Sequence, residues 1–85
     1  MALRIAPRLA WQVVDGETVV VDVEEGRMLG LDGVAACLWP LLESCDVAQL
    51  AEEVVRRFDV DLATARRDVA AFVEELRERR LIVTE

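Results

Sequence analysis

The chain has 85 residues, 54% of them hydrophobic, and its 17 acidic and 10 basic side chains give a formal net charge of -7. This length is near the lower limit for a domain that folds alone, and the apolar share is too high for a disordered segment. We therefore expect one domain over residues 1–85. The negative charge disfavours binding to nucleic acid, which depends on basic patches, and suits a basic peptide segment or a basic patch on an enzyme.

Three β-prone stretches in the first third of the chain predict an antiparallel meander. Residues 9–14 end at Asp15-Gly16, a pair typical of a hairpin turn. Residues 18–23 are rich in β-branched valine and predict the second strand. An acidic turn with a conformationally permissive glycine, Gly26, leads into a third strand over residues 28–31.

Helical patterns follow the strands. An aspartate stands at the start of each of three patterns: Asp32, Asp46 and Asp61. A carboxylate at this position can accept hydrogen bonds from unpaired backbone N–H groups, and Gln49 completes an approximate capping box with Asp46. Because Pro40 lacks a backbone N–H, we expect the first helix to kink or end early around Trp39.

The third helix has a clear amphipathic pattern. Its apolar stripe repeats at spacings of three and four: Leu62, Ala65, Val69, Phe72 and Leu76. A partly basic flank lies just beside that stripe: Arg66, Ala70, Val73 and Arg77. Two interpretations of this flank stay open, namely a solvated helix surface and the wall of a groove.

These elements predict an α+β fold in which a three-stranded antiparallel β-meander packs on a winged-helix-like three-helix unit. The strands fall within about residues 9–31 and the helices within about residues 32–80. Residues 81–83 form either a short strand or an extended tail. The order helix-helix-helix-strand is the outline of a winged helix-turn-helix.

The residues that usually carry catalysis are missing from the sequence. It contains no histidine, lysine or tyrosine, and its cysteines, Cys37 and Cys45, have no base to activate them. We expect both to be free thiols in a reducing cytoplasm, with no metal site and no cofactor. No signal peptide or membrane span is visible. A cytoplasmic binding module, rather than an enzyme, is the prediction.

The order of these patterns resembles the PqqD family. Residues 19–42 give a strand, an acidic glycine turn, a strand ending in Leu31-Asp32, and an alanine-rich helix that bears Trp39. Residues 50–61 and 68–82 are also similar to the family, so that the resemblance covers about residues 10 to 83. It implies a stand-alone peptide chaperone, the recognition element for ribosomally made precursor peptides that are later modified.

The resemblance also implies a binding mode and a partner. The leader segment of a precursor peptide would add as a strand to the third strand, in the cleft with the third helix. The protein would then present it to a modifying enzyme, such as a radical SAM enzyme or a leader peptidase. Edge strands offer unpaired N–H and C=O groups, which favours this mode.

Carried over position by position, the resemblance implies ten peptide-binding residues. The pairing strand would be Arg27, Met28, Leu29, Gly30 and Leu31, and the helical wall Arg66, Val69, Ala70, Val73 and Arg77. Arg66 and Arg77 would pair with acidic leader residues, and Val73 would contact an apolar one. Gly30 either lets a peptide backbone approach closely or marks a bulge or a flexible strand end.

Two positions depart from the family pattern. Arg80 stands where the family often has glycine, so we expect the last helix to end without a left-handed cap. Pro40 is unusual inside a helix. We expect neither position to touch the residues of the implied groove.

Two other functions compete with peptide binding. The first is a winged-helix DNA-binding regulator, whose third helix would enter the major groove. Its arginines alternate with acidic residues, which weakens that interpretation. The second is a structural homodimer that pairs through the same strand edge. A chain that binds the leader but not DNA is a peptide-binding module and not the DNA-binding regulator. The oligomeric state distinguishes peptide binding from the homodimer.

Overall fold

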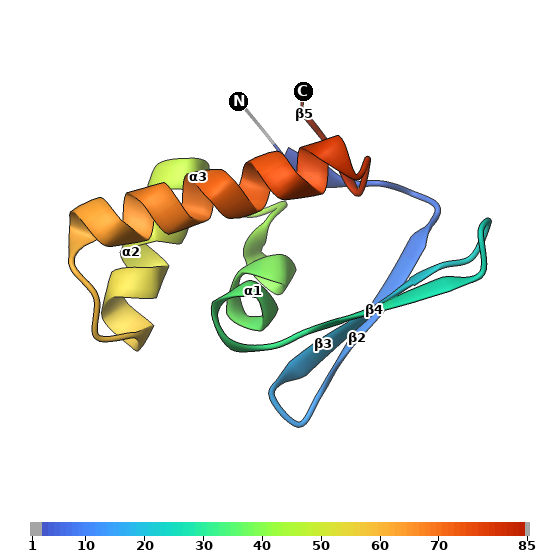
Figure 1. Cartoon of the computed structure of the whole chain (residues 1–85), viewed down its shortest axis with the longest axis horizontal. Coiled ribbons are helices and arrows are strands. Elements are labelled where there is room, and N and C mark those ends of the chain that lie inside the picture. Colours follow the sequence, from blue (N-terminus) through green and yellow to red (C-terminus); the bar gives the residue numbers. More distant parts are fainter. Residues whose placement is uncertain (1–2, 85) are drawn as a thin grey trace.

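Two antiparallel sheets and three α-helices make up the structure, a computed structural model that describes residues 3–84 (Figure 1). The elements in chain order are β1 (Leu3–Ile5), β2 (Leu9–Val14), β3 (Glu17–Asp22), β4 (Arg27–Leu31), α1 (Gly33–Leu38), the 3-10 helix η1 (Trp39–Leu41), α2 (Val47–Arg57), α3 (Leu62–Glu78) and β5 (Ile82–Thr84). In this view α3 lies across the molecule, with α2 beneath its first part and α1 beneath its middle, while the larger sheet lies below its C-terminal part and extends beyond it. The predicted α+β fold is confirmed.

The larger sheet has the order β2-β3-β4, with β3 in the middle. Trp11, Val20 and Leu29 lie opposite one another across its three strands. Positive φ angles at Asp15 and Gly16, 51° and 79°, form the predicted tight turn between β2 and β3. Within the described residues, β2 and β4 each pair on one side only, so the sheet has two free edges.

The inner face of β3 joins the sheet to the helices. Val20 is buried among core residues, and Thr18 is completely buried, with its hydroxyl group donating a hydrogen bond to the carbonyl oxygen of Ala36 at 3.1 Å. This bond satisfies a buried hydroxyl that would otherwise be costly to bury. It also holds β3 against α1, which fixes where β4 begins and ends relative to the helices.

Helix capping follows the prediction at two of three positions. Asp46 and Gln49 form the full capping box, and the Asp61 carboxylate accepts a bond from the Thr64 N–H. Asp32 precedes α1, but its side chain makes no capping bond, so that part of the prediction is wrong. The reason is Gly33, whose φ of 57° takes the chain out of the helical geometry that a capping side chain requires.

The first helix ends where Pro40 predicts. The α-helical segment stops at Leu38 and continues as the 3-10 turn η1, in which the proline occupies an early position that needs no N–H donor. This turn drives Trp39 into the centre of the core, where the ring is completely buried. The core around it is aliphatic: Leu38, Leu42, Leu50, Val54, Val69 and Leu76.

The end of α3 differs from the expectation. Arg80 itself adopts the left-handed conformation, with φ of 60°. Its N–H bonds the Arg77 carbonyl, and the Leu81 N–H reaches back to the Leu76 carbonyl at 2.9 Å, the two bonds of a Schellman cap. The expectation of no left-handed cap is therefore wrong, because the chain must turn here to place β5.

The chain after this cap forms a second, two-stranded sheet. Of the two possibilities left open for residues 81–83, the short strand is the one observed: β5 pairs with β1, with Ile5 opposite Ile82. The sequence did not predict β1. Its pairing brings the start of the described chain to the C-terminal end of α3.

Candidate functional site

A hollow of about 620 Å³ lies beside β4, between this strand and the chain that follows α3. We call it the β4 hollow; its lining is Arg8, Leu9, Val20, Asp22, Glu24, Glu25, Arg27, Met28, Leu29, Arg79, Arg80 and Leu81. Its apolar residues Leu9, Leu29 and Leu81 are half-buried and pack on the core. The floor is therefore apolar and packed on the core, while the rim is charged.

The rim is organised by Asp22, at the end of β3. Arg8 Nε donates to Asp22 Oδ2 at 3.0 Å. Asp22 Oδ1 accepts bonds from the backbone N–H groups of Glu24 and Glu25, each at 3.1 Å. The hydrogen bond from Arg8 is the main cause that holds the pKa of Asp22 below its usual range, and the two backbone bonds add to it. Asp22 therefore fixes the turn from which β4 starts.

The other arginines of the rim differ in their partners. Arg27 Nε lies 3.5 Å from a Glu25 carboxylate oxygen, and Arg79 lies 3.2 Å from Glu75 on the preceding turn of α3. The Arg80 guanidinium makes no hydrogen bond or ion pair with the residues that the structure describes. The rim therefore holds one cationic group whose hydrogen-bond donors are unused.

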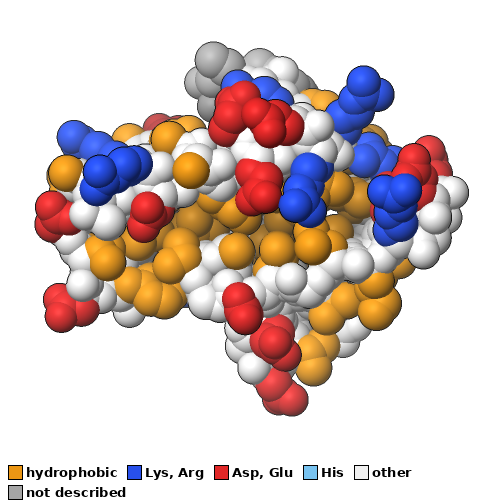
Figure 2. Space-filling model, in the orientation of Figure 1, with side chains coloured by type: hydrophobic (Ala, Val, Ile, Leu, Met, Phe, Trp, Pro, Cys, Tyr) orange, Lys and Arg blue, Asp and Glu red, His pale blue; other side chains and the backbone are white. Residues whose placement is uncertain are grey.

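The surface of the molecule also shows an apolar region bordered by charged side chains. Figure 2 shows hydrophobic side chains gathered in a hollowed band below α3, with basic side chains at the right-hand end of that band. Half-buried apolar residues of β4 and α3, among them Leu31 and Phe72, pack on the core and add to the apolar surface of the molecule. Such a band beside a strand edge can take up apolar side chains of an extended chain.

The predicted pairing strand is a real edge strand. Arg27, Met28 and Leu29 line the β4 hollow, and Gly30 and Leu31 complete the strand beyond it. Gly30 pairs regularly with Val19, so the structure has no bulge there. A Cβ atom built on Gly30 would meet nothing within 4 Å. Nothing inside this chain therefore requires a glycine at that position.

The five residues predicted to form the helical wall do not share one surface of α3. Arg66 and Ala70 are exposed on α3, whereas Val69 and Val73 are 0% and 5% exposed and belong to the core. Arg77 bonds Glu74 and the hydroxyl group of Thr84 in β5. None of these five lines the β4 hollow, so their part in binding stays a prediction.

The residues that do line the hollow from the end of α3 are Arg79, Arg80 and Leu81. The sequence did not place them in the site. The expectation that Arg80 lies away from the groove is wrong, because the turn after α3 brings it beside Arg27, Met28 and Leu29. Arg8 and Asp22 were also missed, because their contact joins the chain before β2 to the end of β3. Only the pairing of the strands brings them together.

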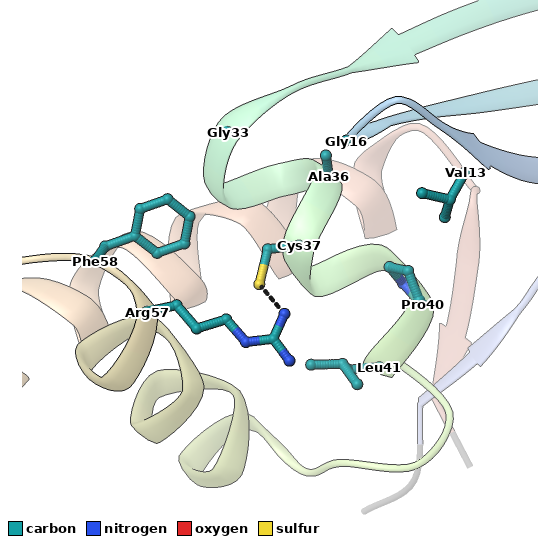
Figure 3. Close-up of a pocket in the computed structure, with 9 residues that line it drawn as sticks. All are labelled: Val13, Gly16, Gly33, Ala36, Cys37, Pro40, Leu41, Arg57 and Phe58. Atoms are coloured by element: carbon teal, nitrogen blue, oxygen red, sulfur yellow. Dashed lines mark hydrogen bonds between the residues drawn. The ribbon is translucent and has the colours of Figure 1, made fainter.

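A second hollow, of about 560 Å³, lies at the opposite end of the strands, by the β2–β3 hairpin, and is called here the β2 hollow (Figure 3). It is lined mainly by apolar residues from the β2–β3 hairpin, α1, η1 and α2, among them Val13, Pro40, Leu41 and Phe58. The Arg57 guanidinium points at Cys37 and lies 3.2 Å from its sulfur. Cys37 and Cys45 are both free thiols, as predicted.

Comparison with known proteins gives the chain a family. The family described as coenzyme PQQ synthesis protein D (PqqD) matches residues 17–82, from the start of β3 to β5. The chain belongs to the PqqD family. The match includes β4, α3 and all of the β4 hollow except Arg8 and Leu9.

Two solved structures are similar to this PqqD-family chain over nearly their whole length. One, TbiB1 in complex with the TbiA(beta) leader peptide, is 25% identical, with a TM-score of 0.87 and 96% of each chain covered. The other, lasso peptide synthetase B1 complexed with the leader peptide, is 26% identical, with a TM-score of 0.86 and coverage of 99% of this chain and 100% of that chain. The search of curated proteins gave no match.

Two further findings concern the range 3–84 that the structure describes. No helix there is long and apolar enough to cross a membrane. No group of three or more His, Cys, Asp or Glu side chains in that range is placed to hold a metal ion.

Proposed function

We propose that this PqqD-family protein binds the leader segment of a ribosomally made precursor peptide. The leader adds as a strand to the free edge of β4, with its side chains over the apolar band and the β4 hollow. The protein then presents the bound precursor to a modifying enzyme, such as a radical SAM enzyme or a leader peptidase. It contributes recognition, and the partner enzyme contributes the chemistry.

The observation that carries the proposal is the free edge of β4 beside a hollow with an apolar floor. Residues Arg27–Leu31 pair with β3 on one side only within the described residues. An added strand would complete the backbone hydrogen bonding of that edge, and the adjacent apolar surface would distinguish among peptide side chains. Family membership and the similarity to two leader-peptide complexes support the same ligand class.

The charges of α3 count against the DNA-binding alternative. Arg77 and Arg79 lie within 3.3 Å of Glu74 and Glu75 on the same helix. A cation that is neutralised by a carboxylate of its own helix releases few counterions from DNA, and the formal net charge of -7 opposes DNA binding further. The homodimer alternative uses the same β4 edge and becomes an outcome of the binding test.

The test is a fluorescence anisotropy titration of a labelled leader peptide, taken from a precursor encoded beside the gene for this chain. We expect saturable binding at micromolar concentration or tighter. A peptide of the same composition in scrambled order and a labelled DNA duplex are the controls, and light scattering measures oligomeric state. A folded monomer that binds neither the leader nor the scrambled peptide would overturn the proposal, and so would a dimer that dissociates only on denaturation.

Presentation to an enzyme needs a separate measurement. The rate at which the neighbouring modifying enzyme converts the full precursor is compared with and without this protein. We expect faster conversion with the protein, and no difference for a precursor that lacks its leader. Equal rates in both cases would remove the presenting role and leave leader binding intact.

A further inference from the structure

Arg80 occupies a backbone conformation that its side chain disfavours. Among the described residues, Asp15 and Arg80 are the non-glycine residues with positive φ. Asp15 belongs to a tight turn whose geometry aspartate tolerates. The C′ position of a Schellman cap is ordinarily glycine, because a Cβ atom clashes with the backbone in this region. An arginine there lowers the stability of the cap, so a gain elsewhere is expected.

The position of Arg80 beside the β4 hollow indicates what offsets the lower stability of the cap. The residue lines the β4 hollow together with Arg27, Met28 and Leu29 of β4 and with Glu24 and Glu25 of the β3–β4 turn. Its guanidinium is without a partner in the described chain, although three other arginines of the same rim have carboxylate partners. Arg80 thus combines a strained backbone conformation with a guanidinium group whose hydrogen-bond donors can bind a ligand.

Resting on the proposed function, we infer that Arg80 recognises an acidic side chain of the leader, held where the added strand passes the Arg27 end of β4. A guanidinium group can donate two parallel hydrogen bonds to one carboxylate, a geometry that gives specificity as well as affinity. The apolar floor formed by Leu29 and Leu81 excludes water from one side of this contact, which strengthens it. The site therefore selects leaders that carry Asp or Glu at that register.

The opposing charge on the rim is Glu24. Asp22, Glu24 and Glu25 are the rim carboxylates; Asp22 is paired with Arg8, and Glu25 lies near Arg27. The Glu24 carboxylate has no such partner in the part of the chain that the structure describes, although its backbone N–H bonds Asp22. It repels an acidic leader residue, so its removal has an effect opposite in sign to the removal of Arg80.

The decisive variant is Arg80→Gly, which removes the guanidinium and restores the residue that the cap prefers. We expect a higher melting temperature together with leader binding weakened by about three- to tenfold, more at low salt than at high salt. Arg80→Asn tolerates the left-handed conformation, retains a side chain and should weaken binding equally. Arg67→Gln, which removes an arginine outside the hollow, is the charge-matched control and should leave binding unchanged. Glu24→Gln should tighten binding.

The partner residue is found by titrating leaders in which each Asp or Glu is replaced in turn by its amide. One replacement should weaken binding to the unchanged protein and have no further effect in Arg80→Gly. If Arg80→Gly and Arg80→Asn bind every leader as the unchanged protein does, Arg80 recognises no acid and the inference is overturned, while leader binding itself stands. If the unchanged protein binds no leader, it is the proposed function that fails.

Discussion

The two free edges of the larger sheet, β2 and β4, offer the same backbone chemistry in different surroundings. Over residues 3–84 each strand pairs with β3 alone, and each contributes residues to a hollow of similar size, about 560 Å³ for β2 and about 620 Å³ for β4. The β2 hollow is mainly apolar, and helices α1 and α2 contribute to its lining, as Figure 3 shows. The β4 hollow has an apolar floor and a rim of arginines and carboxylates.

The difference shows that a free edge is not sufficient for a binding site. An extended peptide gains backbone hydrogen bonds at either edge, so these bonds do not choose between them. Side chains next to the edge do choose, because β4 supplies Arg27, Met28 and Leu29 to the hollow that has an apolar floor, whereas β2 supplies only Leu9. The same hollow holds Arg80, whose guanidinium has no partner among the described residues. The leader is therefore expected to bind at the edge of β4 and not at the edge of β2.

The largest effect is expected from methylating backbone nitrogens of the leader. In an added strand, alternate N–H groups point toward the protein, so methylation of one alternate set should weaken binding by at least about tenfold and the other set far less. Hydrogen exchange identifies the edge: amides of β4 should slow on binding and those of β2 should not. Equal losses along the peptide would indicate a different binding mode, and slower exchange in β2 would indicate the wrong edge.

A smaller loss is expected when an exposed apolar residue of the edge becomes acidic. Met28 is 73% exposed and lines the β4 hollow, so Met28→Asp should leave the free protein folded and weaken leader binding by about tenfold through lost apolar contact. Val14→Asp on β2 adds the same charge at a residue that is 45% exposed, and should leave binding unchanged. Anisotropy titration compares them, and equal weakening by both variants would show an effect of net charge alone.

Replacing Gly30 should weaken leader binding by a few-fold while it makes the fold more stable. Because its Cβ position is open, Gly30→Val should raise the free energy of unfolding by roughly 0.5–1 kcal/mol. Leader binding should weaken by about threefold if a peptide backbone approaches this residue closely. Urea unfolding and anisotropy measure the two effects. Ala10→Val on β2 is the matched control, and a leader affinity equal in both variants would exclude the close approach.

The sequence predicted the parts of this fold that depend on local patterns. Strand alternation, the Asp15-Gly16 turn, the capping box at Asp46 and the break at Pro40 each involve residues close in the chain. The same holds for β4 as the last strand of a meander, whereas its role as the pairing strand was implied by the resemblance to the PqqD family. The edge status of β4 then followed from the order of the strands alone.

The helical side of the site could not be predicted in this way. A helical wheel gives the angles between residues on α3, but it does not tell which flank faces β4. The structure turns Arg77 toward Thr84 in β5, and β5 is held by its pairing with the unpredicted β1. Val73, placed on the flank by its angle, is buried because the core reaches further round the helix than the stripe suggested. Both outcomes depend on contacts distant in sequence.

The smallest effect concerns the turn that starts β4. The pKa of Asp22 is lowered in the folded chain, chiefly by the bond from Arg8, so the carboxylate stabilises the fold above the pKa of the unfolded chain, near 4. That contribution disappears as the pH falls through the lower folded value. Asp22→Asn, which keeps an acceptor for the turn but loses the ion pair, should therefore lower the melting temperature by a few degrees at pH 7.

At an acidic pH below the usual range of an aspartate, where the native carboxylate is increasingly protonated, the difference in melting temperature between Asp22→Asn and the unchanged protein should be smaller than at pH 7. Thermal unfolding followed by circular dichroism at both pH values measures it. Asp15→Asn in the β2–β3 turn is the matched change at the other hairpin, and since asparagine suits the left-handed position, it should keep its stability at pH 7. If the melting temperature of Asp22→Asn differs from that of the unchanged protein by the same amount at both pH values, the Asp22 carboxylate does not stabilise the β3–β4 turn. That turn would then depend on its backbone geometry, as the β2–β3 turn does.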